Sequence, residues 1–299
     1  MIKRIIEISQ AKTYLSIKLG QLIIRQGDEI SSQIPCEDIG LLIVDHSGTT
    51  YTHSVFTTLL EAGTAIVLCG GDHHPAGMFL PTAANSIQTT RMKSQLSAKE
   101  PLKKQLWKQI VKTKIKHQAK VLGPDRDAHH GLMEMARKVR SGDPDNKEAH
   151  ASRLYWKYYI SEIIFHRGRD GPPPNNMLNY GYAIVRAAVA RAIVAAGLNP
   201  SIGLHHHNKY NAFCLADDLL EPFRGFVDAK VLEIWAQSPD EDAFARLTQP
   251  VKARLLEVLH QEVKIGQYSG PLMVGLHRTA ASLVKCYQGE QKQLDLPKV

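Results

Sequence analysis

The sequence predicts an α+β protein, with a small β-sandwich-like N-terminal domain over residues 1–85 and a larger all-helical domain over residues 86–299. Two patterns carry this prediction. Short runs rich in β-branched and aliphatic residues follow one another closely up to about residue 80, and later segments have helical length or period. The composition, 43% hydrophobic and 22% charged over 299 residues, excludes a collagenous, low-complexity or largely disordered chain.

The N-terminal part is expected to contain β-strands bounded by turn-forming residues. The expected strands cover residues 4–8, 14–18, 21–25, 40–44 and 64–68. Their close spacing favours antiparallel pairing. One helix is expected over residues 54–62, with Ser54 as its N-cap and Gly63 as the residue that ends it.

After residue 85 the pattern is helical. Helices are expected over residues 86–122, 129–141, 147–166, 176–196, 211–221, 226–236, 240–260 and 271–288. Residues 177–196 are apolar on nearly every side, which predicts a helix at the centre of the helical domain. The boundary between the two domains is expected between residues 80 and 90.

The positive charge of the chain is concentrated in one segment. The net charge is +8 and the pI is about 9.2, which favours a polyanionic partner such as nucleic acid. Residues 91–120 hold ten lysines and arginines against a single acid, Glu100. Lysines recur there every four residues, a step that drifts only about 40° around a helix. These residues, here called the basic ridge, are Lys104, Lys108, Lys112, Lys116 and Lys120.

The basic ridge has two interpretations. It is either a solvated helix face or a surface that contacts the phosphates of nucleic acid. We favour the second, because this one segment holds the whole positive excess of the chain.

Several features point to a soluble, cytoplasmic protein without a membrane partner. The apolar run at the N-terminus is interrupted at Glu7, too early for a secretory signal. The longest apolar stretch, residues 183–197, contains Arg186 and Arg191 and is shorter than the ~20 residues of a membrane span. No C-x-x-C spacing relates the cysteines, which are expected to be reduced thiols. They are Cys36, Cys69, Cys214 and Cys286.

The densest polar cluster lies in residues 201–224, where three consecutive histidines precede Asp217, Asp218 and Glu221. Asp218 and Glu221 are three residues apart, so a helix places them on one face. Carboxylates with one imidazole suit Mg²⁺ or Mn²⁺ better than structural Zn²⁺. The alternative is that the acids only favour a helix N-terminus and that the histidines form a solvated loop.

A further carboxylate is available from Glu148, at the expected start of a helix. An acid is common at that position, so Glu148 alone would indicate nothing more than helix stabilisation. The same helix carries an aromatic stripe, which packs in a core or stacks on unpaired bases. Its members are Tyr155, Trp156, Tyr158 and Tyr159.

Three separated blocks in a fixed order now indicate a family. They are Glu148 ahead of Tyr155-Trp156, the run NMLNYGYAIVRAAVARAIVAAGLNPSIGLHH at 176–206, and LADDLLEPFRGFVD at 215–228. Together they resemble the CRISPR-associated integrase family that captures new spacers. The resemblance is to its short variety, from loci with a single large RNA-guided nuclease, and it spans most of residues 1–290, including IPCEDIG at 34–40.

The resemblance implies catalytic and metal-binding residues. The family's glutamate, histidine and final acid fall on Glu148, His206 and Glu221, which are expected to hold the metal. Asp218 matches a further catalytic acid beside it. Because His205 neighbours the matched histidine, it remains the second choice for the ligand.

The resemblance also implies the reaction: a Mg²⁺- or Mn²⁺-dependent DNA integrase and endonuclease that inserts short foreign DNA fragments into a CRISPR array. The 3′-hydroxyl ends of a double-stranded fragment would attack the CRISPR repeat DNA in two transesterifications. The family works as dimers bridged by the second CRISPR-associated protein. A metal that neutralises phosphate charge and lowers the pKa of the attacking hydroxyl agrees with this chemistry.

Two rival functions remain. A nucleic-acid-binding module without catalysis would need only the basic segment and the aromatic stripe, but it leaves Glu148, His206 and Glu221 unexplained. A zinc hydrolase built on residues 205–207 would need further ligands, and the H-E-x-x-H pattern is absent. The sequence also lacks a Walker loop and a G-x-G-x-x-G motif, which argues against an NTPase and a dinucleotide-binding protein.

Overall fold

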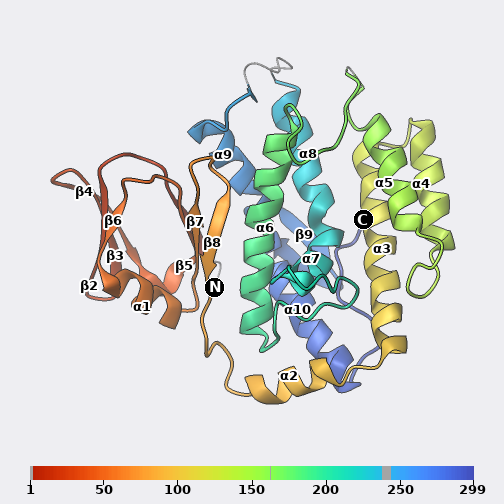
Figure 1. The fold of residues 1–299 in the computed structure, drawn as a ribbon, viewed down its shortest axis with the longest axis horizontal. Coiled ribbons are helices and arrows are strands. Elements are labelled where there is room, and N and C mark those ends of the chain that lie inside the picture. Colours follow the sequence, from red (N-terminus) through yellow and green to blue (C-terminus); the bar gives the residue numbers. More distant parts are fainter. Residues whose placement is uncertain (1–2, 162, 238–243) are drawn as a thin grey trace.

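The computed structural model describes residues 3–161, 163–237 and 244–299 (Figure 1). Strands dominate the N-terminal part and helices the rest. The N-terminal elements are β1 (Arg4–Ile8), β2 (Thr13–Lys18), β3 (Gln21–Gln26), β4 (Glu29–Pro35), η1 (Cys36–Asp38), β5 (Ile39–Val44), β6 (Thr50–Tyr51), α1 (His53–Glu61), β7 (Ala65–Cys69) and β8 (Pro75–Phe79). They form two four-stranded sheets, in the orders β1-β5-β7-β8 and β4-β3-β2-β6.

Strand direction is only partly as expected. Strands β2, β3 and β4 pair antiparallel, as does β7 with β8, but β5 pairs parallel with both β1 and β7. The expectation of antiparallel pairing is therefore wrong for these neighbours of β5. The chain passes through the β2–β4 meander between β1 and β5, and through α1 between β5 and β7. These crossovers return the chain to the same end of the sheet.

Helix α1 differs from the expectation at its N-terminus but not at its C-terminus. Ser54 is not the N-cap: the cap position is Thr52, and its hydroxyl lies 2.8 Å from the Ser54 hydroxyl instead of bonding to the backbone. Gly63 does end the helix. Its φ of +76° suits glycine, and its N–H donates to the Leu60 carbonyl at 3.0 Å.

Strand β5 is buried along its whole length because it has a core on each face. On one face, Leu42 packs in a cluster with Leu15 of the second sheet and Leu59 of α1. On the other face, Leu41 and Ile43 belong to the large cluster that continues into the helices. The first sheet is therefore the layer between the second sheet and the helical part.

The C-terminal part is not all-helical. Its elements are α2 (Gln88–Leu96), α3 (Glu100–Leu122), α4 (Asp127–Lys138), α5 (Lys147–Tyr158), α6 (Asn175–Ala195), α7 (Cys214–Leu220), η2 (Glu221–Phe223), α8 (Arg224–Trp235), α9 (Gln249–Leu256), η4 (Glu257–His260), β9 (Glu262–Ile265), β10 (Tyr268–Pro271) and α10 (Leu272–Gln288). The sequence pattern misses the β9–β10 hairpin, whose strands have four residues each and are joined by a turn at Gly266 with φ +60°. Such short strands carry little periodicity.

Several helix boundaries also differ from the expected ones. The single helix expected over 86–122 is two, α2 and α3, because Pro101 in the first turn of α3 has no N–H for a continuous helix. Helix α5 ends at Tyr158 and not at 166. Of the expected helix 240–260, residues 240–243 lie outside the described residues, and α9 begins at Gln249.

Helix α6 is the central element, as expected. It is buried on nearly every side, and Figure 1 shows it between the strands and helices α3, α4 and α5. Although α6 is long and apolar, no helix among the described residues is long and apolar enough to cross a membrane.

Candidate active site

Two predicted site residues meet at one buried lysine. The ammonium nitrogen of Lys114 lies 2.6 Å from Oε1 of Glu148 and 2.7 Å from Oε2 of Glu221. Lys114 comes from the buried face of α3, Glu148 from the first turn of α5, and Glu221 from the residue that follows α7. The fold thus brings Glu148 and Glu221 around a single cation.

A local turn places Glu148. The side chain of Asp143 accepts hydrogen bonds from the backbone N–H groups of Lys147 and Glu148, each at 2.9 Å. These are two of the N–H groups that the start of a helix leaves without intrahelical partners. Asp143 itself and Asn146 adopt positive φ values of +50°, which aspartate and asparagine tolerate better than most residues.

Glu221 is a buried carboxylate held between two cations. Besides Lys114, it accepts a hydrogen bond from Nε of Arg224 at 2.9 Å, one turn further along the chain. Burial raises the pKa of Glu221, but Arg224 and Lys114 outweigh burial and lower this pKa to about 2. Burial alone would lower the pKa of Lys114, because it disfavours the charged form here too. The charges of Glu221 and Glu148 outweigh burial and raise this pKa. Glu221, Lys114 and Arg224 are therefore ionised at neutral pH.

His206 is positioned by Asp218, whose side chain is fully buried. The Asp218 carboxylate accepts backbone N–H bonds from Leu204 at 2.6 Å, His205 at 3.0 Å and His206 at 3.2 Å. It also lies 2.6 Å from Nδ1 of His206, which donates, since a carboxylate only accepts. Nδ1 is thereby occupied, and Nε2 is left as the ring atom available to a ligand.

The hydrogen bond to Asp218 also favours the protonated form of the His206 ring. It raises the pKa of His206 against the opposing effect of burial, and the charges of Asp218, Glu221 and Glu148 act in the same direction as the hydrogen bond. His206 thus lies within the electrostatic field of both carboxylates that meet at Lys114.

The neighbouring histidines have other contacts. The ring of His205 stacks on buried Trp107, with ring centroids 4.2 Å apart and an interplanar angle of 2°. Burial lowers the pKa of His205. Nδ1 of His207 bonds to the backbone carbonyl of His205 at 2.7 Å. The geometry therefore favours His206 over His205 as a ligand.

The donor set suits a hard divalent cation, although a lysine lies in its centre. Among residues 3–161, 163–237 and 244–299, no three His, Cys, Asp or Glu side chains lie together in an arrangement that could hold a metal. However, Oε2 of Glu221 is buried and has no hydrogen bond within the described structure, only the ion pair with Lys114. Two carboxylates gathered on one positive charge, with an oriented imidazole nearby, fit Mg²⁺ or Mn²⁺ in their chemistry.

Sequence reasoning missed Lys114, Arg224, Asp143 and Trp107 as parts of the site. Lys114 could have been found. It falls three, four and seven residues after Val111, Ile110 and Trp107, which places a lysine on the apolar stripe of α3. Arg224 lies within the 215–228 block, where the family motif assigns it no role.

The other predicted groups are dispersed around the site. In the basic ridge, Lys104, Lys116 and Lys120 are exposed, and Lys108 and Lys112 are partly exposed. The aromatic stripe is divided between two environments. Tyr155 and Tyr159 are buried and donate to Asp228, whereas Trp156 and Tyr158 line a surface groove.

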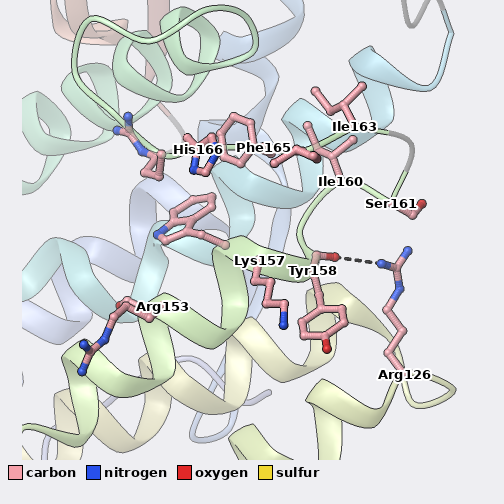
Figure 2. A pocket seen from close by; sticks show the side chains of 13 residues that line it. Arg126, Arg153, Lys157, Tyr158, Ile160, Ser161, Ile163, Phe165 and His166 are labelled. Carbon is pink, nitrogen blue, oxygen red and sulfur yellow. Dashed lines mark hydrogen bonds between the residues drawn. The ribbon is translucent and has the colours of Figure 1, made fainter.

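Two hollows share lining residues, and Glu221 lines the smaller of them. A cavity of 180 Å³ is lined by Lys114, Gln118, Ser152, Trp156, Glu221 and Arg224, among others. A larger groove of 680 Å³ shares Ser152, Trp156 and Arg167 with it, and Figure 2 shows the basic and apolar side chains around that groove. Arg126 at its edge donates to the carbonyl of Tyr158 at 2.8 Å. None of the described residues that line the groove is acidic.

Comparison with known proteins decides the family. A family model described as CRISPR associated protein Cas1 matches residues 6–257. A relative from Neisseria meningitidis serogroup C (strain 8013), named CRISPR-associated endonuclease Cas1, is 37% identical over 289 residues, which cover 95% of this chain and 93% of the relative. The chain belongs to the Cas1 family. The resemblance inferred from the three sequence blocks is confirmed.

Other proteins are similar over most of this chain at lower sequence identity. A Cas1 endonuclease of Pyrobaculum aerophilum is 27% identical over 278 residues, covering 88% of this chain and 92% of the relative. The structure of a Cas1 protein from Thermotoga maritima superposes with a TM-score of 0.77 at 17% identity, covering 97% of each chain. A casposase bound to integration product gives a TM-score of 0.81 at 16% identity, covering 98% of this chain and 92% of that chain. At such low identity the two structures show the fold alone, with N-terminal strands and a helical C-terminal part.

Proposed function

We propose that this Cas1-family chain is a divalent-metal-dependent DNA endonuclease and integrase that inserts short DNA fragments into a CRISPR array by transesterification. The observation that carries the proposal is the convergence of Glu148 and Glu221 on one cation, with His206 held by a buried Asp218. The name of the Neisseria relative, an endonuclease, and the integration product bound to the casposase support it.

The residues have distinct proposed roles. Glu148, Glu221 and His206 would hold Mg²⁺ or Mn²⁺, which when bound neutralises phosphate charge and activates a hydroxyl. Arg224 fixes the orientation of Glu221. Asp218 was expected as a catalytic acid, but its oxygens already accept four hydrogen bonds. We therefore propose it as the positioning residue of His206.

The proposed substrates are a double-stranded DNA fragment and CRISPR repeat DNA. The groove that shares lining residues with the Glu221 cavity contains Arg126, Arg153, Lys157 and Arg167, whose charges suit phosphates. The basic ridge on α3 is the proposed surface for the backbone of the fragment.

The proposed partners are a second copy of this chain and the second CRISPR-associated protein, Cas2. A chain from a structure entitled Cas6-RT-Cas1--Cas2 complex superposes with a TM-score of 0.79 at 18% identity, covering 97% of this chain and 35% of that chain.

We also keep the division into a domain of residues 1–85 and a catalytic domain of residues 86–299 as a proposal. Strand β8 ends at Phe79 and α2 begins at Gln88, and every proposed catalytic residue follows that link.

The test is transfer of a labelled DNA fragment into a supercoiled plasmid, with and without Cas2 and a chelator. We expect transfer that EDTA abolishes, that Mg²⁺ or Mn²⁺ restores and that Zn²⁺ alone does not. Glu148→Gln should abolish transfer while fragment binding persists. Glu134→Gln, an exposed glutamate on α4, is the matched control and should behave as the wild type. Transfer by Glu148→Gln at the wild-type rate would contradict the proposal, and full recovery with Zn²⁺ alone would favour the zinc hydrolase.

A further inference from the structure

Lys114 is a lysine on the buried face of α3, where a charged side chain is uncommon. Lysine is among the residue types least often buried, yet Lys114 is only 9% exposed. Its ammonium touches both proposed metal ligands, at 2.6 Å from Glu148 and 2.7 Å from Glu221. With Arg224 on the other oxygen of Glu221, the two carboxylates face two cations, so the cluster is already neutral.

We propose that Lys114 is a built-in counter-cation that holds Glu148 and Glu221 together in the metal-free protein, and that a divalent cation must displace its ammonium from this pair. The inference rests on the proposed function, because it assumes that the pair holds the metal. A metal ion bonds carboxylate oxygens at about 2.0–2.1 Å in the case of Mg²⁺, so it needs the oxygen lone pairs that now face the ammonium. Retaining both cations would also place like charges against each other in a buried site.

The structure provides room for the displaced ammonium. Lys114 lines the 180 Å³ cavity, and so does Gln118, one helical turn later on the same face of α3. Oε1 of Gln118 is buried and has no hydrogen-bond partner among the described residues. The flexible lysine side chain can therefore leave the carboxylates and donate to an acceptor that is otherwise unsatisfied.

This arrangement has two opposite consequences for the site. Without metal, the ammonium prevents repulsion between two carboxylates that the fold holds close together. With metal, it is a competitor, so it lowers the affinity of the site and keeps the metal exchangeable. Removal of the Lys114 charge should therefore destabilise the metal-free protein and tighten metal binding.

The experiment measures Mn²⁺ binding to the full chain, from the electron paramagnetic resonance signal of free Mn²⁺, and thermal unfolding in EDTA. For Lys114→Met we expect a dissociation constant about tenfold or more below that of the wild type. We also expect a lower unfolding temperature in EDTA and a larger rise on addition of Mn²⁺. Lys116→Met, an exposed lysine two residues away on the same helix, is the control and should match the wild type in both measurements.

Two further variants keep the inference falsifiable if Lys114→Met does not fold in EDTA. Lys114→Met combined with Glu148→Gln removes one charge of each sign, so it should recover stability in EDTA while losing Mn²⁺ binding. Gln118→Leu removes the acceptor for the displaced ammonium. Introduced into the wild-type chain it should weaken Mn²⁺ binding, whereas introduced into Lys114→Met it should leave Mn²⁺ binding unchanged. If Gln118→Leu leaves the affinity of the wild type unchanged, the proposed destination of the ammonium is wrong.

The outcomes separate this inference from the proposed function. If Mn²⁺ binding by the wild type does not depend on Glu148, the pair is not the metal site and the proposed function fails. If binding depends on Glu148 but Lys114→Met binds Mn²⁺ no more tightly than the wild type, only the counter-cation inference is overturned. Glu148-dependent binding that tightens in Lys114→Met supports both.

Discussion

The buried carboxylate of Asp218 lies 2.6 Å from Nδ1 of His206 and also accepts the backbone N–H group of the same residue at 3.2 Å. One side chain therefore fixes both the backbone and the ring of His206. A carboxylate on the second nitrogen of a metal-binding histidine fixes its tautomer and raises its basicity. The same contact gives His206, and not His205, a ring nitrogen directed by a buried acid.

This contact predicts opposite results for the two adjacent histidines. His206→Ala should lower strand transfer about 100-fold or more, because it removes a proposed ligand. His205→Ala loses the stacking contact with Trp107, worth about 0.5–1.5 kcal/mol of stability, and an edge contact with the ring of His206, but it keeps the proposed ligand and should retain most transfer. Strand transfer and thermal unfolding are measured for both variants. An inactive His205→Ala beside an active His206→Ala would show that the assignment is shifted by one residue.

The turn that carries His206 predicts a strict need for glycine at position 203. A Cβ atom there would clash with the backbone oxygen of His206 and lie 2.8 Å from Oδ2 of Asp218. Because the backbone must move to admit it, Gly203→Ala should lower strand transfer about tenfold or more and lower the unfolding temperature.

The matched control for this turn is Gly71→Ala, since a Cβ at Gly71 has no neighbour within 4 Å. It should unfold and transfer strands as the wild type does. If Gly203→Ala also matched the wild type in both measurements, the turn would not be the element that orients His206.

Local sequence pattern predicts some elements well and topology poorly. The apolar run of β5 identifies a buried strand, because both of its faces pack in a core. The pattern does not identify the neighbours of that strand. Parallel pairing of β5 with β1 follows from the route of the chain through β2–β4, which no alternation of side chains encodes.

The same limit applies to the site. The family motif leads to Glu148, His206 and Glu221, but it does not show that Lys114 lies between the two glutamates. Lys114 is one of the ten cations of the 91–120 segment, but it lies two residues from both Lys112 and Lys116, about 200° around the helix and so on the face opposite the ridge. Its position on the apolar stripe of α3 is the local signal of burial, and its contacts depend on the packing of α3 against α5 and η2.

A buried carboxyl next to the site predicts a pH-dependent stability. Asp228 is 1% exposed, accepts hydrogen bonds from the hydroxyls of Tyr155 and Tyr182, and faces Arg224 and Arg167. Burial raises its pKa to about 6, although the tyrosines and arginines oppose this shift. In the unfolded chain its pKa is about 4. Between about pH 4 and pH 6, Asp228 holds a proton in the folded protein that it has lost in the unfolded chain. The contribution of Asp228 to the free energy of unfolding therefore falls as the pH rises through 6.

The variant Asp228→Asn isolates this effect, because asparagine stays neutral at every pH tested. At pH 5 the wild type carries a neutral Asp228, and the two proteins should differ least in unfolding temperature. At pH 8 the wild type has a buried charge, so the unfolding temperature of Asp228→Asn relative to the wild type should rise. A difference that stays constant from pH 5 to pH 8, or moves the other way, would contradict the raised pKa.

The basic ridge, formed by Lys104, Lys108, Lys112, Lys116 and Lys120, is the proposed surface for the backbone of the DNA fragment. If it holds the DNA fragment, each phosphate contact removed should flatten the plot of log affinity against log salt by about 0.9 for duplex DNA. Lys108→Ala with Lys112→Ala should therefore reduce the slope by about 1.8. Stability should change by no more than about 0.5 kcal/mol, because both side chains are partly exposed and form no ion pair with any described residue.

The control for the ridge removes the same charge from other surfaces, with Lys18→Ala on β2 and Lys138→Ala on α4. Net charge then falls equally in both double variants, so a non-specific effect of charge would flatten both slopes alike. Contact along α3 flattens only the slope of the ridge variant. Fragment affinity measured between low and moderate salt separates the two cases. An unchanged slope in the ridge variant would place the DNA on another surface, with the cationic groove beside Trp156 as the next one to test.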